Sequence, residues 1–397
     1  MAYTRIVEKS ILKLLNKPEL VILYGPRRVG KTTVLRGLFE KLRRDHCCAS
    51  YTLDDPSASM IFQHPSTERL KAIFSEIGFS ESRKNYLFLD EVQSFEGIDK
   101  LLKLIFDHFS HVKVIATSSS SLLLLQSLTE SLAGRKYFLE LLPLTLSEYR
   151  NLEVKDYFSF PEFLTRAEEL TNSVHSFAVF GSFPEVLLIK ESQGKMSKLR
   201  DILDSSLYKD IFILENIKAP KALVQLVQLL SYQIGNLVNL NEIATQLGIS
   251  RNTVNEYVSI LEKFFIVFRL TPFERNLRSE MTSRFKVYFW DLGVRNAVIS
   301  RFSPFAARDD RGALFENLVV ASILKRNLYS GRIFKTFFWR TYDGFEIDLI
   351  LENVETEEIW AVQISTSGKT RFSRAFDRYN PTRKIAVNAG EGYRYCL

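Results

Sequence analysis

One short segment near the start of the chain limits its fold more than any other. It reads Gly25-Pro26-Arg27-Arg28-Val29-Gly30-Lys31-Thr32 and fits the spacing G-x-x-x-x-G-K-[ST]. An apolar run at residues 20–24 precedes it, and residues 32–44 follow with helical spacing. A strand, a glycine-containing turn and a helix in this order predict a loop whose backbone N–H groups surround a phosphate group.

The residue types in this loop predict a nucleotide site. Glycine lets backbone N–H groups turn inward, Lys31 is expected to reach the β- and γ-phosphates, and the Thr32 hydroxyl is expected to bind Mg²⁺. No Asn-Lys-x-Asp motif typical of guanine recognition occurs, which favours ATP over GTP. The residues expected to hold ATP are Gly25, Pro26, Arg27, Arg28, Val29, Gly30, Lys31, Thr32 and Thr33.

A pair of acidic residues follows a second apolar run. Residues 86–89 are large and apolar, and Asp90 and Glu91 come directly after them. An acid at the carboxyl end of a buried strand faces the crevice where ligands bind. We expect Asp90 to help hold Mg²⁺ and Glu91 to orient and polarise the attacking water.

Two further residues are candidates for the same chemistry. The apolar run at residues 112–117 leads into four serines, and we expect Ser118 to hydrogen-bond the water or the γ-phosphate. The alternative is that the serines cap a following helix. Arg135 is a candidate for stabilising transition-state charge, in its own chain or in a neighbouring subunit. A plain surface arginine is the alternative.

The order of apolar runs and helical segments predicts the fold class. Apolar strands at residues 50–53, 86–89 and 112–117 alternate with helices, which indicates an α/β fold with a parallel sheet. The length of 397 residues fits several domains. We expect a P-loop ATPase core at residues 1–150, a helical lid at 151–237, a winged helix or helix-turn-helix at 238–275, and an α/β domain at 284–397.

The segment at residues 240–257 has the pattern of two helices around a glycine turn. Gly248 permits the turn and Ser250 can cap the second helix. In a DNA-binding unit the second helix enters the major groove, so the candidate DNA contacts are Arg251, Asn252, Thr253 and Asn255. The same helix carries Glu256 and Glu262, so packing or protein contact stays open as the alternative.

Together these motifs resemble a group of bacterial and archaeal AAA-type ATPases. Members of this group have an AAA core, a winged-helix segment and a C-terminal domain similar to restriction endonucleases. The resemblance implies ATP binding and an ATPase fold, and it implies no known biological role. The stretches that carry it are residues 25–33, 87–93, 117–124, 130–135, 142–144, 180–185, 207–210, 288–293 and 339–340.

The C-terminal part departs from a working nuclease in one strand. A site of the restriction-endonuclease kind needs an Asp on the second strand and Glu-x-Lys on the third. Asp348 fits the first acid, and Glu316 could add a ligand from the preceding helix. Gln363 and Ser365 stand where Glu and Lys are required. We therefore expect an inactive nuclease site. The alternative is that a lysine from elsewhere, such as Lys369, replaces the missing charge.

Net charge, cysteine content and hydropathy exclude fewer classes of function than the motifs do. The net charge of +7 allows a DNA partner without requiring one, and the three cysteines match no zinc spacing and suggest a reducing cytoplasm. No apolar run is long enough for a membrane span. We expect a cytoplasmic, Mg²⁺-dependent ATPase that couples nucleotide state to DNA or to a protein client. A switch without DNA contact and, less favoured, an ATP-gated nuclease are the alternatives, and homo-oligomerisation stays open.

Overall fold

The computed structural model describes residues 3–119, 131–154, 157–160, 163–204, 211–212, 217–273, 284–341, 344–367, 372 and 374–397. Ser120, Ser121 and Lys369 lie outside the described residues. The chain divides into two compact units, Met1–Leu142 and Pro143–Leu397. In the described part, no helix is long and apolar enough to cross a membrane.

The first unit is built on a parallel sheet. Its described part has five strands in the order β2-β3-β4-β1-β5, and all neighbours run parallel. The strands are β1 (Leu20–Gly25), β2 (Cys47–Thr52), β3 (Asn85–Asp90), β4 (Val112–Ser119) and β5 (Lys136–Glu140). The helices are α1 (Ile6–Leu14), α2 (Lys31–Leu42), α3 (Pro56–Phe62), α4 (Thr67–Glu76) and α5 (Ile98–His108), with a 3₁₀ turn η1 (Val92–Ser94).

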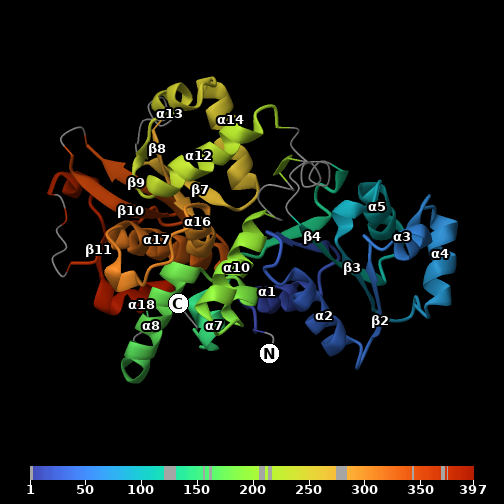
Figure 1. The fold of residues 1–397 in the computed structure, drawn as a ribbon. Coiled ribbons are helices and arrows are strands. Elements are labelled where there is room, and N and C mark those ends of the chain that lie inside the picture. Colours follow the sequence, from blue (N-terminus) through green and yellow to red (C-terminus); the bar gives the residue numbers. More distant parts are fainter. Residues whose placement is uncertain are drawn as a thin grey trace. The chain divides into compact units, whose positions relative to one another are not determined.

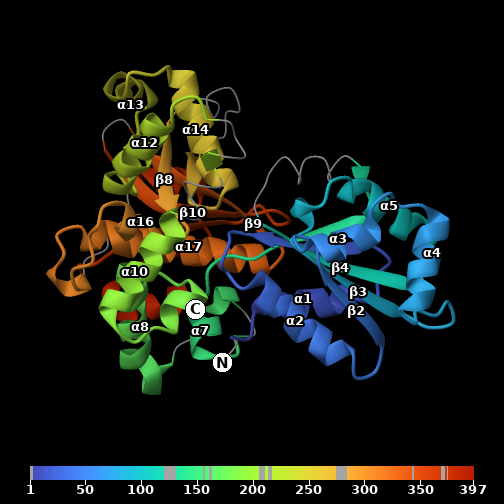
Figure 2. The same cartoon turned by 45° about the vertical axis from the view of Figure 1, so that its right-hand side comes forward.

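Helices cover both faces of this sheet. Helix α2 lies on one face, and α4 and α5 lie on the other (Figures 1 and 2). Leu87 and Leu89 of β3 pack into the core beneath α4 and α5, whereas Phe88, between them, meets Phe39 of α2. Alternate residues of a strand point to opposite faces, so a strand covered on both faces must be apolar at every position. This parallel α/β core confirms the predicted fold class.

The second unit combines helices with a mixed sheet. The strand order in its described part is β12-β11-β10-β9-β7-β8-β6, seven strands in all. These strands are β6 (Leu237–Val238), β7 (Val267–Pro272), β8 (Phe285–Phe289), β9 (Phe334–Arg340), β10 (Glu346–Asn353), β11 (Ile359–Ser365) and β12 (Arg383–Asn388). The helices are α7 (Leu146–Arg150), α8 (Ala167–Phe180), α9 (Pro184–Leu187), α10 (Ser192–Ile202), α12 (Pro220–Tyr232), α13 (Leu240–Leu247), α14 (Arg251–Lys263), α16 (Leu292–Val298), α17 (Arg311–Tyr329) and α18 (Gly392–Cys396). The 3₁₀ turns are η2 (Tyr157–Ser159), η3 (Leu164–Arg166), η5 (Phe305–Ala307), η6 (Arg374–Tyr379) and η7 (Ala389–Glu391).

This sheet includes strands from both sides of a predicted domain boundary. Strand β7 belongs to the segment 238–275, and it pairs in parallel with β9 of the segment 284–397 through Thr271 and Phe337. One sheet therefore contains strands from both of these predicted domains. The expected strand at 50–53 begins earlier, at Cys47.

Two of the sequence stretches that carry the family resemblance meet in the second unit. A Cβ atom on Gly181 would lie 2.0 Å from Oδ1 of Asp291, and one on Gly293 would lie 2.3 Å from the carbonyl oxygen of Phe180. Asp291 accepts hydrogen bonds from the backbone N–H groups of Ser182 (2.7 Å) and Val294 (3.1 Å). Residues 180–185 and 288–293 thus form a close structural contact between α8 and α16. Gly293 has no room for a side chain against the Phe180 backbone, and Gly181 has none against the Asp291 carboxylate.

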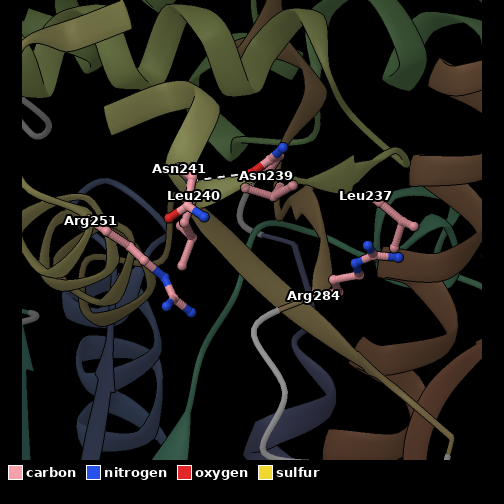
Figure 3. A pocket seen from close by; sticks show the side chains of 7 residues that line it. Leu237, Asn239, Leu240, Asn241, Arg251 and Arg284 are labelled. Atoms are coloured by element: carbon pink, nitrogen blue, oxygen red, sulfur yellow. Dashed lines mark hydrogen bonds between the residues drawn. The ribbon is translucent and has the colours of Figure 1, made fainter. Parts of the chain in front are cut away.

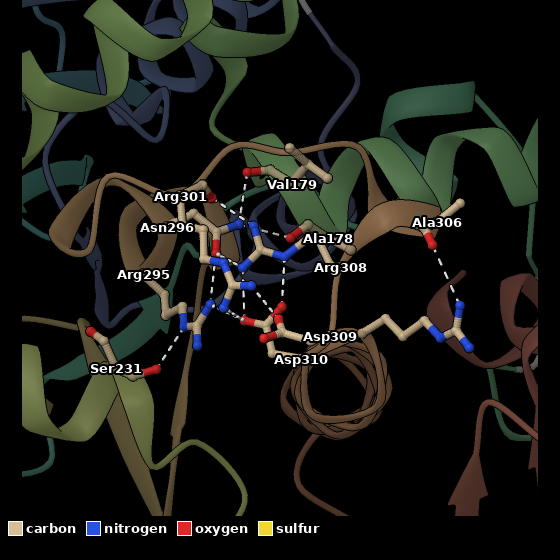
Figure 4. Close-up of polar contacts among 11 residues, drawn as sticks. Ala178, Val179, Ser231, Arg295, Asn296, Arg301, Ala306, Arg308, Asp309 and Asp310 are labelled. Carbon is tan, nitrogen blue, oxygen red and sulfur yellow. Dashed lines mark hydrogen bonds and ion pairs between the residues drawn. The ribbon is translucent and has the colours of Figure 1, made fainter.

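A buried network of arginines joins four segments of the second unit (Figure 4). Arg308 makes two hydrogen bonds of 2.7 Å to the Asp310 carboxylate, and Arg295 makes another of 2.7 Å. Arg295 also donates to the Ser231 carbonyl oxygen of α12 (2.7 Å). Asn296 donates to two carbonyl oxygens of α8, both at 2.9 Å. Asp310 is therefore the carboxylate that compensates two buried guanidinium groups.

Asp310→Asn is expected to destabilise the second unit by about 3 kcal/mol or more at neutral pH, because it leaves two buried guanidinium groups without their counter-charge. Burial raises the pKa of Asp310, but hydrogen bonds and charges from Arg308 and Arg295 outweigh it and lower the pKa to about 2. An unfolded Asp titrates near ~3.9, so this stabilisation is present above about pH 4 and is lost as the pH falls toward 2. Urea unfolding followed by tryptophan fluorescence should show the difference from wild type shrinking over that range. Asp309→Asn, at an exposed neighbour, should change little, and an Asp310→Asn protein as stable as wild type at pH 7 would refute this account.

Candidate nucleotide-binding site

The register of the first sheet gathers the predicted site at one edge. All five strands are parallel, so their carboxyl ends lie at the same edge. Gly25, which ends β1, is paired with Ser119, which ends β4, and Thr52 of β2 is paired with Asp90, which ends β3. Neighbouring strands are about 4.8 Å apart, so Asp90 lies only two strand spacings from the start of the loop. Residues far apart in sequence therefore meet at the mouth of the glycine-containing loop.

The loop at residues 25–30 has a backbone that turns sharply into α2. Arg28 and Gly30 have positive φ values of 65° and 96°, and Gly30 is the N-cap of α2. The Lys31 side chain is buried, and its ammonium group donates to the carbonyl oxygens of Gly25 and Pro26, both at 3.0 Å. Thr32 and Thr33 are exposed on the first turn of α2. The lysine is thus held over the loop, with the two threonines at the positive end of the helix.

A buried arginine at the start of α1 contacts the backbone of the loop. Arg5 is 3% exposed and donates to the carbonyl oxygens of Val29 and Leu142, both at 2.6 Å. These bonds join α1, the loop and the last residue of the unit, which are separated by 24 and 137 positions. These two buried hydrogen bonds tie the loop to the end of the unit, so Arg5 stabilises the loop shape. Arg5 could not be predicted from sequence, because a lone arginine before a helix has no local signature of burial.

Asp90 and Glu91 occupy the carboxyl end of a fully buried strand. The Asp90 carboxylate accepts a hydrogen bond from the Thr117 hydroxyl of β4, and that hydroxyl accepts one from the backbone N–H of Glu91 (3.2 Å). Asp90 is 4% exposed, whereas Glu91 is only half-buried and has a left-handed backbone with φ 52°. The sharp turn at Glu91 directs the chain away from the sheet immediately after the strand. Thr117 is a further residue that the sequence analysis assigned only to the strand.

Gln93, two residues beyond Glu91, connects the two strand ends. Its amide nitrogen donates to the Glu91 carboxylate, and its amide oxygen accepts from the backbone N–H of Ser119 (3.0 Å). The Ser118 hydroxyl, fully buried, lies 3.1 Å from the same amide oxygen. The Ser118 hydroxyl therefore faces Gln93 in this structure, and its contact with the water or the γ-phosphate stays a prediction. The alternative, a helix cap, concerns residues outside the described part.

The oxygen donors at this edge suit Mg²⁺. Hydroxyl and carboxylate oxygens are the ligands that Mg²⁺ prefers, and the ion keeps several waters and substrate phosphate oxygens in its shell. Thr32 supplies an accessible hydroxyl and Asp90 a carboxylate at the two sides of the loop mouth. Among the described residues there is no group of three or more His, Cys, Asp and Glu placed to hold a metal. A phosphate-bound Mg²⁺ held by one carboxylate and one hydroxyl needs no such group.

Arg135 lies at the opposite edge of the sheet. Its carbonyl oxygen accepts from the N–H of Leu20, the first residue of β1, and its guanidinium forms an ion pair with Asp107 at 2.8 Å. Strand β1 has six residues, so Arg135 is roughly 16 Å from the loop mouth. Arg135 is therefore held away from the phosphate loop of its own chain in this structure. Its role at the phosphates, in its own chain or in a neighbouring subunit, stays a prediction.

The predicted acids of the second unit meet a lysine that the sequence analysis missed. Lys286 of β8 is 1% exposed, lies 3.3 Å from Glu316 of α17 and also pairs with Glu346 of β10. The Tyr288 hydroxyl donates to Glu316 (2.7 Å). Burial lowers the pKa of Lys286, but the nearby carboxylates outweigh it and raise the pKa above its usual value. The only sequence signal was a single lysine within an otherwise apolar strand.

Asp348 sits beside this lysine in an environment that opposes its charge. It accepts from the Gln363 amide (2.8 Å) and from the backbone N–H of Ile364 (2.7 Å). Burial, and then the charge of Glu316, raise the pKa of Asp348 to about 7. Ser365 bonds to Ser367 (2.8 Å). The described acids are thus engaged by Lys286, Tyr288 and Gln363, and they do not fit a metal centre.

The four candidate DNA contacts on α14 differ in their surroundings. Arg251 and Asn252 are exposed, whereas the Thr253 hydroxyl pairs with Ser250 (2.8 Å) and Asn255 accepts from Arg269 (3.0 Å). Arg269 is itself paired with Glu262 at 2.5 Å. A groove of about 340 Å³ lies at the start of α13 and α14, with Arg251 and Arg284 in its lining (Figure 3). Its other lining residues are Leu237, Val238, Asn239, Leu240 and Asn241.

Three protein-family models match different parts of the chain. Residues 17–150 match an AAA domain. Residues 171–304 and 311–394 match two further families, each described as a domain of unknown function. The part of the chain that holds the loop, Asp90 and Glu91 is therefore the part with a described family.

Similar proteins extend over nearly the whole chain. An uncharacterised protein of Methanocaldococcus jannaschii is 27% identical over 406 residues, covering 98% of this chain and 86% of the relative. An uncharacterised protein of Haemophilus influenzae is 25% identical over 365 residues, covering 90% and 85%. The names of these relatives give no activity.

Solved structures resemble the chain more distantly. The ORC1 protein of Aeropyrum pernix in complex with DNA is 16% identical with a TM-score of 0.35, covering 76% of this chain and 93% of that one. AMPPCP-bound DnaA from Aquifex aeolicus is 17% identical with a TM-score of 0.29, covering 66% and 90%. Scores this low carry no inference about fold or ligand. The family match over residues 17–150 is what supports an AAA-type, nucleotide-binding ATPase domain in this chain.

Proposed function

We propose that this chain binds ATP with Mg²⁺ at the carboxyl edge of the first sheet and hydrolyses it. One observation carries the proposal: the parallel register brings the glycine-containing loop, Asp90 and Glu91 to the same edge. The match to an AAA domain supports nucleotide binding and ATPase activity in general. Which residues bind ATP, and what each of them does, are part of what we propose.

Each residue of the site has a physically defined task. The backbone N–H groups of residues 28–32 and the Lys31 ammonium bind the phosphates, and the α2 dipole adds positive potential. The Thr32 hydroxyl and the Asp90 carboxylate would hold Mg²⁺, which when bound neutralises phosphate charge. The loop dipoles are fixed in place before the nucleotide binds, so they need not reorganise during the reaction.

Glu91 is the group that acts on water. The water oxygen attacks the γ-phosphorus, and the bond from that phosphorus to the β–γ bridging oxygen breaks. The Glu91 carboxylate orients the water and accepts its proton, so that ADP and inorganic phosphate leave. Glu91 is half-buried, so it is not fully shielded from solvent.

Glu91→Gln is expected to lower kcat for ATP hydrolysis by about a hundredfold or more while ATP still binds, because the amide keeps the shape and loses the base. Lys31→Ala is expected to weaken ATP binding itself. Steady-state turnover and fluorescent-nucleotide binding measure the two effects separately. Glu96→Gln, at an exposed residue of the same segment, is the control and should behave as wild type. Glu91→Gln turning over at the wild-type rate would show that the assignment of Glu91 is wrong.

We further propose that the nucleotide state is coupled to DNA through the winged-helix segment. The exposed Arg251 and Arg284 in the groove beside α13 and α14 support this, since two arginines can engage neighbouring phosphates. A protein client is the alternative, favoured by the pairing of Arg269 with Glu262, which removes free positive charge from this helix. The C-terminal acids are proposed to be structural, as an inactive nuclease site whose charge Lys286 compensates.

Arg251→Ala combined with Arg284→Ala is expected to weaken DNA binding about equally for all sequences and to make it less salt-dependent. Each lost phosphate contact reduces the slope of log K against log salt by about 0.9. Fluorescence anisotropy with a labelled duplex at several salt concentrations, with and without ATP, measures this. Lys335→Ala removes one exposed positive charge from β9 and serves as the control. Absence of DNA binding by the wild type at low salt would favour the protein-client alternative.

A further inference from the structure

Gln93 lies between the carboxyl ends of two neighbouring strands of the first unit, β3 and β4. It lies in the 3₁₀ turn η1, which follows Glu91 directly. Its side chain spans from the carboxylate of Glu91 at the end of β3 to the end of β4 at Ser118 and Ser119. All of these contacts lie within the first unit, and the proposed hydrolysis gives Gln93 no role so far.

The hydrogen-bond partners fix which way the Gln93 amide points. A carboxylate accepts hydrogen bonds only, so it must face the NH₂ group of the amide. The backbone N–H of Ser119 donates only, so it must face the amide oxygen. A reversed amide would place oxygen against carboxylate and NH₂ against N–H. Gln93 is therefore held in one orientation by two partners with opposite requirements.

Glu91 has few other constraints on its side chain. It is half-buried, it follows the buried strand β3, and its own backbone turns in the left-handed region. A glutamate side chain has several rotatable bonds, and positioning one costs conformational entropy. A fixed NH₂ donor selects one carboxylate position, and its other oxygen remains available for a water molecule.

We propose that Gln93 is a positioning residue that holds the Glu91 carboxylate for its action on water. This inference rests on the proposed ATPase function. The far end of Gln93 is anchored to Ser119, and Ser119 is paired with Gly25 at the start of the loop. Gln93 thus fixes the position of the Glu91 carboxylate relative to β4, the strand beside the start of the phosphate-binding loop. A misplacement of about 1 Å in such an arrangement costs on the order of a hundredfold in rate.

Two variants and one control test this role by steady-state kinetics and by direct ATP binding. Gln93→Ala is expected to lower kcat about ten- to a hundredfold, with KM and the ATP dissociation constant within about twofold of wild type. Gln93→Glu keeps an oxygen facing Ser119 but sets a carboxylate against Glu91, so kcat should fall similarly. Gln63→Ala, at an exposed residue ending α3, should match wild type in all three quantities.

The outcomes separate this inference from the proposed function. If Glu91→Gln loses turnover while Gln93→Ala or Gln93→Glu keeps the wild-type kcat, the positioning role is refuted and the ATPase proposal stands. If the Gln93 variants lose ATP affinity together with kcat, Gln93 supports the fold of the site and the positioning role is also refuted. Gln93→Glu guards against a folding defect in Gln93→Ala, because it preserves the acceptor for Ser119. A wild-type protein without ATP turnover would refute the ATPase proposal itself.

Discussion

Strand β1 ends at a residue that has no room for a side chain. A Cβ atom on Gly25 would lie 2.1 Å from the carbonyl oxygen of Leu141, which is backbone and cannot rotate away. This close approach lets β1 lie between β4 and β5 up to its last residue, and it lets the loop turn at once into α2. Arg5 then joins the loop to Leu142 through two buried carbonyl groups. The shape of the loop, the reach of Lys31 and the place of Asp90 beside it all depend on this packing.

Buried charge organises the second unit in a different way. Its described part sets Asp310 among arginines and Lys286 among carboxylates, and each of these two has a counter-charge at hydrogen-bond distance. Such pairs contribute little net stability over apolar packing, but removing one partner is costly. Lys286 pairs with Glu316 and Glu346, and so compensates part of the buried negative charge around Asp348.

The parts of the site that could be predicted from sequence are those that lie within a few residues of each other. The loop, Lys31, and the Asp90–Glu91 pair after a buried strand have local patterns, because a single turn must place them. Arg5, Thr117 and Lys286 could not be predicted, since their partners are distant in sequence and their types are common. Gln93 has a near partner in Glu91, but its contacts with Ser118 and Ser119 depend on the fold. The sequence shows that Arg135 precedes a strand, whereas the sheet register was needed to show how far it lies from the loop.

The central claim is that the loop after β1 holds the phosphates of ATP, and a crystal structure with Mg²⁺ and a non-hydrolysable ATP analogue tests it most directly. The account predicts phosphates against the backbone N–H groups of residues 28–32. Lys31 should leave the carbonyl oxygens of Gly25 and Pro26, which it contacts at 3.0 Å, and move to the β- and γ-phosphates. A nucleotide bound elsewhere, with Lys31 still on those carbonyl groups, would contradict the account.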